Sequence, residues 1–173
     1  GEKYYDFSDQ RFFRLVQLKW ELIFEVLKLN YDFIIYSDTD VIWNKSPIEL
    51  VSNRLNENLN VEILIQDASV DFGQKRLCMG FVAIRNSNGA KNLLEEAKNL
   101  HHLNSSLIAS YGDDDAMSDL YIKNSDNKIE LLPQILFPVG ILFNLYSKKS
   151  TYPGLSGIEP YIFHANFVIG LKR

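Results

Sequence analysis

The chain has 173 residues, 46% of them hydrophobic and 13% aromatic, and a formal net charge of −4. This composition supplies enough apolar side chains for a globular core, and the length predicts one domain. The negative net charge argues against a general nucleic-acid-binding protein, which would present a basic surface. Cys78 is the only cysteine and no run of about 18 apolar residues occurs, so we expect no internal disulfide, cysteine metal site or transmembrane helix.

The first half of the chain predicts two helices and two strands. Residues 12–29 carry apolar side chains at helical spacing, with charges between them, and predict a long helix with a wide buried face. Residues 32–38, DFIIYSD, form a short continuous apolar run that is typical of a strand covered on both faces. Pro47 opens a short helix, PIELVSNRL, and residues 61–67 predict the second strand.

The second half continues this alternation of strands and helices. We expect a strand at 80–86, helices at 88–103 and 113–124, strands at 128–133 and 161–167, and a surface loop at 147–160. Such alternation predicts an α/β fold with a mixed, mostly parallel sheet and flanking helices. The sequence shows no internal repeat and no domain boundary, so we expect residues 1–173 to form a single domain.

Asp38 and Asp40 interrupt the apolar run IIYSDTDVIW, where an unpaired carboxylate would be costly to bury. Residues i and i+2 of an extended chain point to the same side, so the two carboxylates converge if the strand continues, or wrap a common point if the chain turns. Carboxylates brought together repel unless a cation lies between them, and such oxygen ligands suit Mg²⁺ or Mn²⁺. The alternative is that both aspartates cap a turn that Asn44 and Pro47 complete.

Histidines offer a further ligand for such a site. His164 lies near the end of the strand-like stretch YIFHANF and could complete a site begun by the two aspartates. His101 and His102 fall on the predicted amphipathic helix, where we expect both to be solvated.

The acidic run YGDDDAMSDLY marks the start of a predicted helix. Asp115 is expected to cap the positive end of that helix. Asp113 and Asp114 could instead reach a substrate hydroxyl, because Gly112 lets the backbone approach closely. We therefore treat Asp113 and Asp114 as candidate catalytic residues.

Four segments follow one another along the chain: LKWELIFEVLKLNYDFIIYSDTDVIWNKSP, CMGFVAIRNSNGAKNLL, DDDAMSDL, and FPVG followed by HANFVIGLK. In this order they resemble elements of the nucleotide-diphospho-sugar transferases, glycosyltransferases of the GT-A fold. The matching elements are the D-x-D with its W-x-x-x-P, the Cys/Gly–Phe strand, the acidic helix start, and the closing His–Gly–Lys. The resemblance spans residues 12–172 and implies a GT-A-like, Rossmann-like sheet.

The resemblance also implies a set of metal and donor ligands. Asp38, Asp40 and His164 would hold Mn²⁺ or Mg²⁺ against the diphosphate of a nucleotide sugar, with a UDP-sugar expected as the donor. In the closing element, Gly170 would belong to the donor-binding set and Lys172 would face the phosphates, where a cation stabilises the leaving group. A second lysine, Lys19, could also face the phosphates, but we expect it to be a solvated surface residue.

Further implications concern the sugar and the reaction. Gly80 would keep space open for the donor sugar, and Asp113 and Asp114 would hold the sugar or the acceptor hydroxyl. Relatives commonly carry Asp-Gln where this chain has Asp113-Asp114. The implied reaction transfers a sugar, with retention of configuration, to a hydroxyl of a glycan, protein or small molecule. We also expect the chain to be a fragment, the C-terminal two-thirds of a catalytic domain whose nucleoside-binding part precedes Gly1.

Two other functions fit the same residues. Haloacid-dehalogenase-like phosphatases also place D-x-D after an apolar strand, and there Asp38 would be a covalent nucleophile and Asp40 an acid/base. That interpretation leaves HANFVIGLK without a role. The third possibility is a non-catalytic module that binds a nucleotide or glycan through a metal ion.

Overall fold

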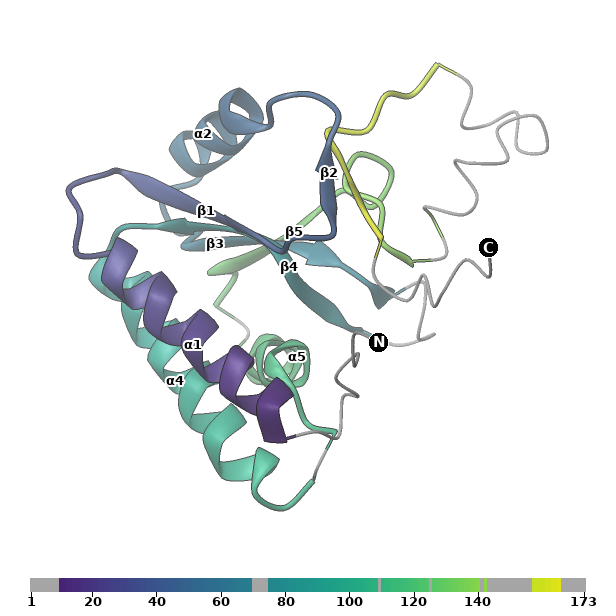
Figure 1. Cartoon of the computed structure of the whole chain (residues 1–173). Helices are drawn as coiled ribbons and strands as arrows, with labels where there is room; N and C mark the ends of the chain where they lie inside the picture. Colours follow the sequence, from purple (N-terminus) through teal and green to yellow (C-terminus); the bar gives the residue numbers. More distant parts are fainter. Residues whose placement is uncertain are drawn as a thin grey trace, which may run out of the picture.

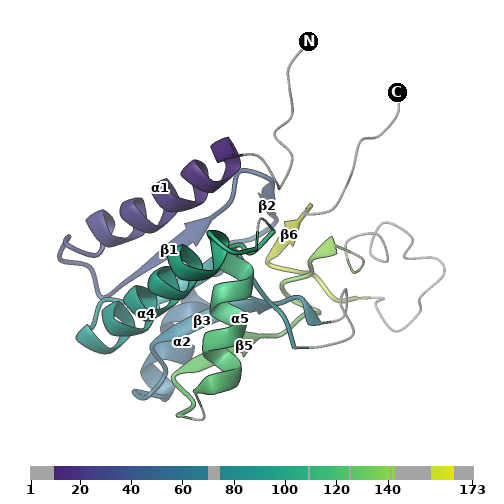
Figure 2. The same cartoon turned by 90° about the horizontal axis from the view of Figure 1, so that it is seen from below.

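The computed structural model describes residues 10–69, 75–108, 110–124, 126–140, 142 and 157–165. A four-stranded sheet lies at its centre with helices on both faces, which confirms the expected α/β fold (Figure 1). Helices α1 (Gln10–Val26), α4 (Asn88–Ser105) and α5 (Asp113–Lys123) cover one face, and Figure 2 shows them together on that face. Helix α2 (Ile48–Glu57) covers the other face.

The sheet is mixed, as expected. Its strands are β1 (Phe33–Ser37), β4 (Leu77–Arg85), β3 (Ile63–Asp67) and β5 (Ile129–Leu132), in that spatial order. Strand β4 pairs antiparallel with both β1 and β3, whereas β3 and β5 pair in parallel. The pairing thus differs from a mostly parallel sheet, because β4 lies in the middle and runs against both of its neighbours.

Apolar side chains pack on both faces of the sheet. The core under α1, α4 and α5 includes Trp20 and Met79, and the core under α2 includes Phe81 and Phe137; all four are at most 1% exposed. Strand β4 contributes to both cores and is buried from Leu77 to Ile84, which explains its continuous apolar sequence.

The ladder between β3 and β4 is irregular close to the candidate site. Ile65 pairs with Val82, but the next residue of β3, Gln66, pairs with Cys78. The β4 residues between these two partners therefore have no counterpart on β3, as in a bulged strand. At this point the carbonyl of Gly80 accepts a hydrogen bond from the Asp38 backbone N–H at 2.8 Å, so the irregular segment is tied to the end of β1.

The chain turns immediately after β1, and this decides between the two geometries considered for the aspartates. The backbone N–H of Val41 donates to the carbonyl of Asp38 at 3.3 Å. The following strand β2 (Val41–Trp43) leaves the main sheet and pairs antiparallel with β6 (Ile162–His164), with Val41 opposite His164. The sequence VIW therefore forms a separate short strand and does not extend β1.

Other element boundaries lie close to the expected ones. Helix α1 ends at Val26, three residues before the predicted end, and β4 begins at Leu77, three residues earlier than predicted. Most of the expected loop at 147–160 and the end of the strand expected at 161–167 lie outside the described residues. Within the described ranges, none of the helices combines the length and the apolar character that crossing a bilayer requires.

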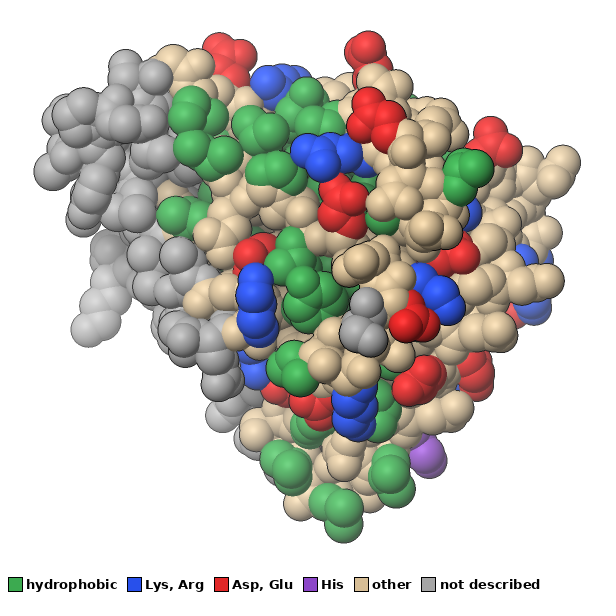
Figure 3. Space-filling view, turned by 180° about the vertical axis from the view of Figure 1, so that it is seen from behind, with side chains coloured by type: hydrophobic (Ala, Val, Ile, Leu, Met, Phe, Trp, Pro, Cys, Tyr) green, Lys and Arg blue, Asp and Glu red, His purple; other side chains and the backbone are tan. Residues whose placement is uncertain are grey.

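The surface opposite the view of Figure 1 carries both signs of charge. Acidic and basic side chains are interspersed there with polar and apolar ones, and the described side chains form no broad basic area on this face (Figure 3).

Phe81 provides a test of the packing under α2. Its ring is fully buried, with centroids 5.4 Å from the Phe137 ring and 5.7 Å from the Trp43 ring. Phe81→Ala should lower the free energy of unfolding by about 3–5 kcal/mol in urea titrations, because it removes buried area and leaves a cavity. Leu59→Ala, at a side chain that is 75% exposed, serves as the control and should change it by about 0.5 kcal/mol or less. Equal effects would contradict this core.

Candidate active site

The three predicted metal ligands come together in the structure. Asp38, Asp40 and His164 each offer one ligand atom, and these atoms lie within 4.8 Å of one another. The turn after β1 carries the two aspartates, and the β2–β6 pair brings His164 to them from the far end of the chain. The Ala165 backbone N–H donates to the Asp40 carbonyl at 3.1 Å and closes this connection.

His164 is held from several sides. The residue is 2% exposed, and its Nδ1 lies 3.0 Å from Gln66 Oε1 and 3.5 Å from Cys78 Sγ. Its Nε2 lies 3.3 Å from Asp40 Oδ1. Burial lowers the pKa of His164, although the Asp40 carboxylate opposes this shift.

Gly80 contacts the imidazole directly. A Cβ at this position would lie 1.8 Å from His164 Cε1, so a residue with a side chain would displace the ring. The space that we expected Gly80 to leave for a donor sugar is filled by His164. The glycine is therefore needed for the close approach of β4 to the histidine.

Lys19 also belongs to the site, so the expectation that it is solvated is wrong. Its Nζ lies 2.7 Å from Asp113 Oδ2 and 3.3 Å from Asp38 Oδ1, and its side chain is 11% exposed. The ammonium also lies 4.7 Å from the centroid of the Tyr36 ring. The Tyr36 hydroxyl donates to the same Asp38 Oδ1 at 2.6 Å.

The charge of Lys19 is stabilised by its partners. Burial alone would lower the pKa of Lys19, but the carboxylates of Asp113 and Asp38 outweigh burial and raise it. Burial also raises the pKa of Tyr36, which keeps the phenol protonated as a donor. Asp38 is therefore compensated by a basic side chain on α1 even without a metal ion.

The three acids at the start of α5 have different contacts. Asp113 faces Lys19. Asp114 Oδ1 accepts a hydrogen bond from the Met79 backbone N–H at 2.6 Å and so pins α5 to β4. Asp115 accepts from the Gly112 backbone N–H at 2.9 Å and pairs with Arg76, which confirms the expected cap. Because Asp114 is bound to the backbone of β4, the expected role in substrate binding is proposed for Asp113 alone.

The remaining predicted residues are Gly170, Lys172, His101 and His102. Gly170 and Lys172 lie outside the described residues. His102 is exposed as expected, but His101 is 2% exposed, so its expected solvation is wrong. Sequence reasoning missed Tyr36 and Gln66 and misjudged Lys19. A signal for Lys19 exists, because it follows the buried Val16 by three residues and precedes the buried Ile23 by four, on the same face of α1.

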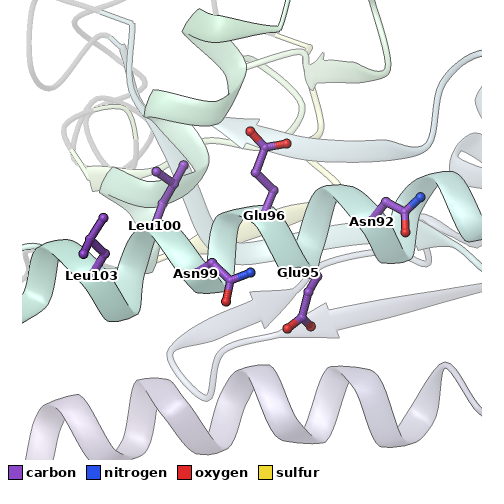
Figure 4. A pocket seen from close by; sticks show the side chains of 6 residues that line it. All are labelled: Asn92, Glu95, Glu96, Asn99, Leu100 and Leu103. Carbon is purple, nitrogen blue, oxygen red and sulfur yellow. The ribbon is translucent and has the colours of Figure 1, made fainter.

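A surface hollow away from this site lacks a comparable set of metal ligands. It is lined by α4 alone, as Figure 4 shows, through Asn92, Glu95, Glu96, Asn99, Leu100 and Leu103. These side chains include no nitrogen ligand that would complete a metal site with the two glutamates. The cluster around Asp38 and His164 remains the candidate active site.

The sequence profile of the nucleotide-diphospho-sugar transferases matches residues 2–173. The chain belongs to the nucleotide-diphospho-sugar transferase family. It is 31% identical over 96 residues to the uncharacterized protein At1g28695 of Arabidopsis thaliana, an alignment that covers 56% of this chain and 26% of the relative.

Solved glycosyltransferases share the fold of this family member. Galactosyltransferase LgtC, solved with donor and acceptor sugar analogs, superposes with a TM-score of 0.57 at 10% identity, covering 86% of this chain and 58% of LgtC. Mouse xyloside xylosyltransferase 1 gives 0.53 at 12% identity, covering 86% of this chain and 64% of the enzyme. GlyE of Streptococcus pneumoniae TIGR4 gives 0.54 at 15% identity, covering 84% and 36%. The chain thus has the GT-A fold and spans a little over half of LgtC.

Lys19→Met tests the buried ion pairs of this transferase-family chain. The substitution keeps a similar volume but leaves Asp38 and Asp113 without their cation, so the free energy of unfolding should fall by about 3–5 kcal/mol. Lys19→Arg should recover part of that loss because it keeps the charge. Lys28→Met, which removes an ion pair whose side chains are 66–67% exposed, should cost roughly 0–1 kcal/mol in the same denaturant titration. A loss no larger than that of Lys28→Met would contradict the buried pairing.

Asp114 predicts a pH dependence of stability. Burial, reinforced by the Asp113 carboxylate, raises the pKa of Asp114 from 3.8 to about 7. The folded chain therefore binds this proton more tightly than the unfolded chain, and Asp114 adds stability as the pH falls from about 7 toward 3.8. In Asp114→Asn this contribution is absent. As the pH is lowered over that range, the unfolding free energy of the wild type should rise relative to that of Asp114→Asn. A difference that does not change with pH would contradict the raised pKa of Asp114.

Proposed function

We propose that this chain carries the metal site of a glycosyltransferase that moves a sugar from a nucleotide-diphosphate donor, a UDP-sugar, to a hydroxyl acceptor. The observation that carries the proposal is the juxtaposition of His164 Nε2 and the carboxylates of Asp40 and Asp38. Family membership supports the donor class. The chain covers 58% of LgtC, so the activity is stated here as a proposal.

The residues present fit a divalent cation. Nδ1 of His164 faces the side-chain oxygen of Gln66, so in the neutral imidazole Nε2 presents a lone pair to Asp40. Two acceptors 3.3 Å apart need a cation or a proton between them. Burial of His164 disfavours the proton, which would make the imidazole a charged group.

The charge balance points the same way. Asp38 and Asp40 bring two carboxylates to one place, whereas Lys19, the cation that contacts Asp38, is shared with Asp113. Carboxylates gathered in this way are stabilised by a divalent ion between them. Carboxylate oxygens with one imidazole nitrogen suit Mn²⁺, and Mg²⁺ is the alternative.

In this proposal each residue of the site has a role. The bound cation would supply Lewis-acid stabilisation of the charge that develops on the leaving diphosphate. Asp38, Asp40 and His164 would hold it. Asp113, oriented by Lys19, would accept a hydrogen bond from a hydroxyl of the donor sugar or of the acceptor. Gly170 is retained as a proposed donor-binding residue and Lys172 as a proposed phosphate contact, and retention of configuration is part of the same proposal.

A metal-dependent nucleotide- or glycan-binding module is the second candidate. The observation that favours it is the partial coverage of the solved transferases, between 36% and 64% of their lengths for the three described above. Binding of UDP with Mn²⁺ but no sugar transfer, in the longest natural form of the chain, would support this candidate. The phosphatase interpretation loses its support because the family match extends over residues 2–173.

Removal of the aspartates tests the metal site. Asp38→Asn and Asp40→Asn should each abolish Mn²⁺-dependent binding of UDP in isothermal calorimetry, because each variant removes an anionic ligand. Asp126→Asn, at an exposed aspartate whose nearest ion-pair partner is Lys128 at 3.7 Å, is the matched control and should bind like the wild type. Unchanged binding in both site variants would refute the metal assignment.

A further inference from the structure

We propose that Gln66 is a positioning residue that fixes the tautomer of His164, so that Nε2 is offered to a cation and is not used in a closed hydrogen bond with Asp40. The inference rests on the proposed function, because it explains how this chain keeps the metal position available. Gln66 is fully buried and contacts His164, so it acts through the imidazole.

The position of Gln66 follows from the irregular ladder between β3 and β4. Regular pairing ends at Ile65, and Gln66 is shifted to face Cys78 on β4. A bulge of this kind re-aims a side chain relative to a regular strand. The Gln66 side chain is fully buried, so its amide must find partners inside the protein.

The hydrogen-bond partners of Gln66 determine which way the amide points. Its Nε2 lies 3.3 Å from the backbone carbonyl oxygen of Phe137, which can only accept. The amide nitrogen must therefore face Phe137, and the amide oxygen must face His164 Nδ1 at 3.0 Å. Because that oxygen can only accept, the proton of the neutral imidazole resides on Nδ1.

The second neighbour of Nδ1 does not compete with this arrangement. Cys78 Sγ lies 3.5 Å from Nδ1, and a thiol is both a weak donor and a weak acceptor, so its contact is weaker than that of the Gln66 amide oxygen at 3.0 Å. The ring also packs closely against Gly80, where a Cβ would lie 1.8 Å from Cε1.

The opposite tautomer would close the site. With its proton on Nε2, the imidazole could donate to Asp40 Oδ1, which is only 3.3 Å away, and the two groups would satisfy each other without a cation. Gln66 thus favours the tautomer in which Nε2 can bind a metal ion over the tautomer in which Nε2 donates a hydrogen bond to Asp40. Outer partners that fix the tautomer of a ligating histidine typically contribute about 10–100-fold to metal affinity.

The test reads the tautomer before any metal is added. Two-bond proton–nitrogen correlation spectra of the nitrogen-15-labelled chain, metal-free and at alkaline pH, should show His164 protonated on Nδ1. Gln66→Met removes the acceptor at similar volume and should shift the proton toward Nε2. In calorimetry with Mn²⁺ alone, the same variant should bind about 10–100-fold more weakly.

Two further variants serve as controls. Gln66→Glu keeps an acceptor for Nδ1–H, and should retain the Nδ1 tautomer and Mn²⁺ binding. Cys78→Ala removes the other neighbour of Nδ1 and should leave both readouts unchanged. If Gln66→Met does not fold, Gln66→Glu still decides, since an Nε2 proton in that variant overturns the proposal.

The outcomes separate this inference from the proposed function. A wild-type His164 protonated on Nε2 overturns the role of Gln66, whatever the metal does. Retention of the Nδ1 tautomer in Gln66→Met, or its loss in Cys78→Ala, also overturns it. An Nδ1 tautomer in a chain that binds no Mn²⁺ supports the role of Gln66 in orienting His164 and refutes the metal site.

Discussion

The ion pairs of Lys19 are the interaction on which the rest of this site depends. One ammonium on α1 contacts Asp38 after β1 and Asp113 at the start of α5, so three elements meet at a single buried charge. Removing the lysine would leave both carboxylates without the cation that they contact. The arrangement sets where α1 lies along the sheet and compensates Asp38 from inside the protein. Asp40 faces His164 on the other side of the turn, so its carboxylate lies where the cation is proposed to bind.

The histidine side of the site depends on backbone irregularity. His164 reaches the aspartates only because β2 leaves the main sheet and pairs with β6. The ring then fits only because Gly80 has no side chain and β4 departs there from regular pairing with β3. The same departure aims Gln66 at Nδ1. The place of the imidazole and its contact with Gln66 thus both involve one irregular segment of β4 next to a short second sheet.

Much of the fold could be predicted because each long element has a strong local signal. In α1 and α4, apolar residues recur at helical spacing over several turns, and in β4 they form one continuous run. Such long patterns indicate the element and its buried side without any tertiary contact. The three-residue strand β2 was not predicted, because VIW continues the apolar run of β1 and the local pattern allowed both a turn and a continued strand at the aspartates. His101 was misjudged for a related reason, since helical polarity alone does not show that a polar side chain lies under a neighbouring helix.

The sequence by itself indicated the order of the longer strands and helices, Asp38, Asp40 and His164 as candidate metal ligands, and the likeness to the transferase family. Only the tertiary structure decided that Lys19 compensates Asp38 and that Gln66 orients His164. The physical reason is that both decisions depend on strand register and helix placement between residues far apart in the chain, where a shift of one residue sends a strand side chain to the opposite face. Local composition carries no record of that register.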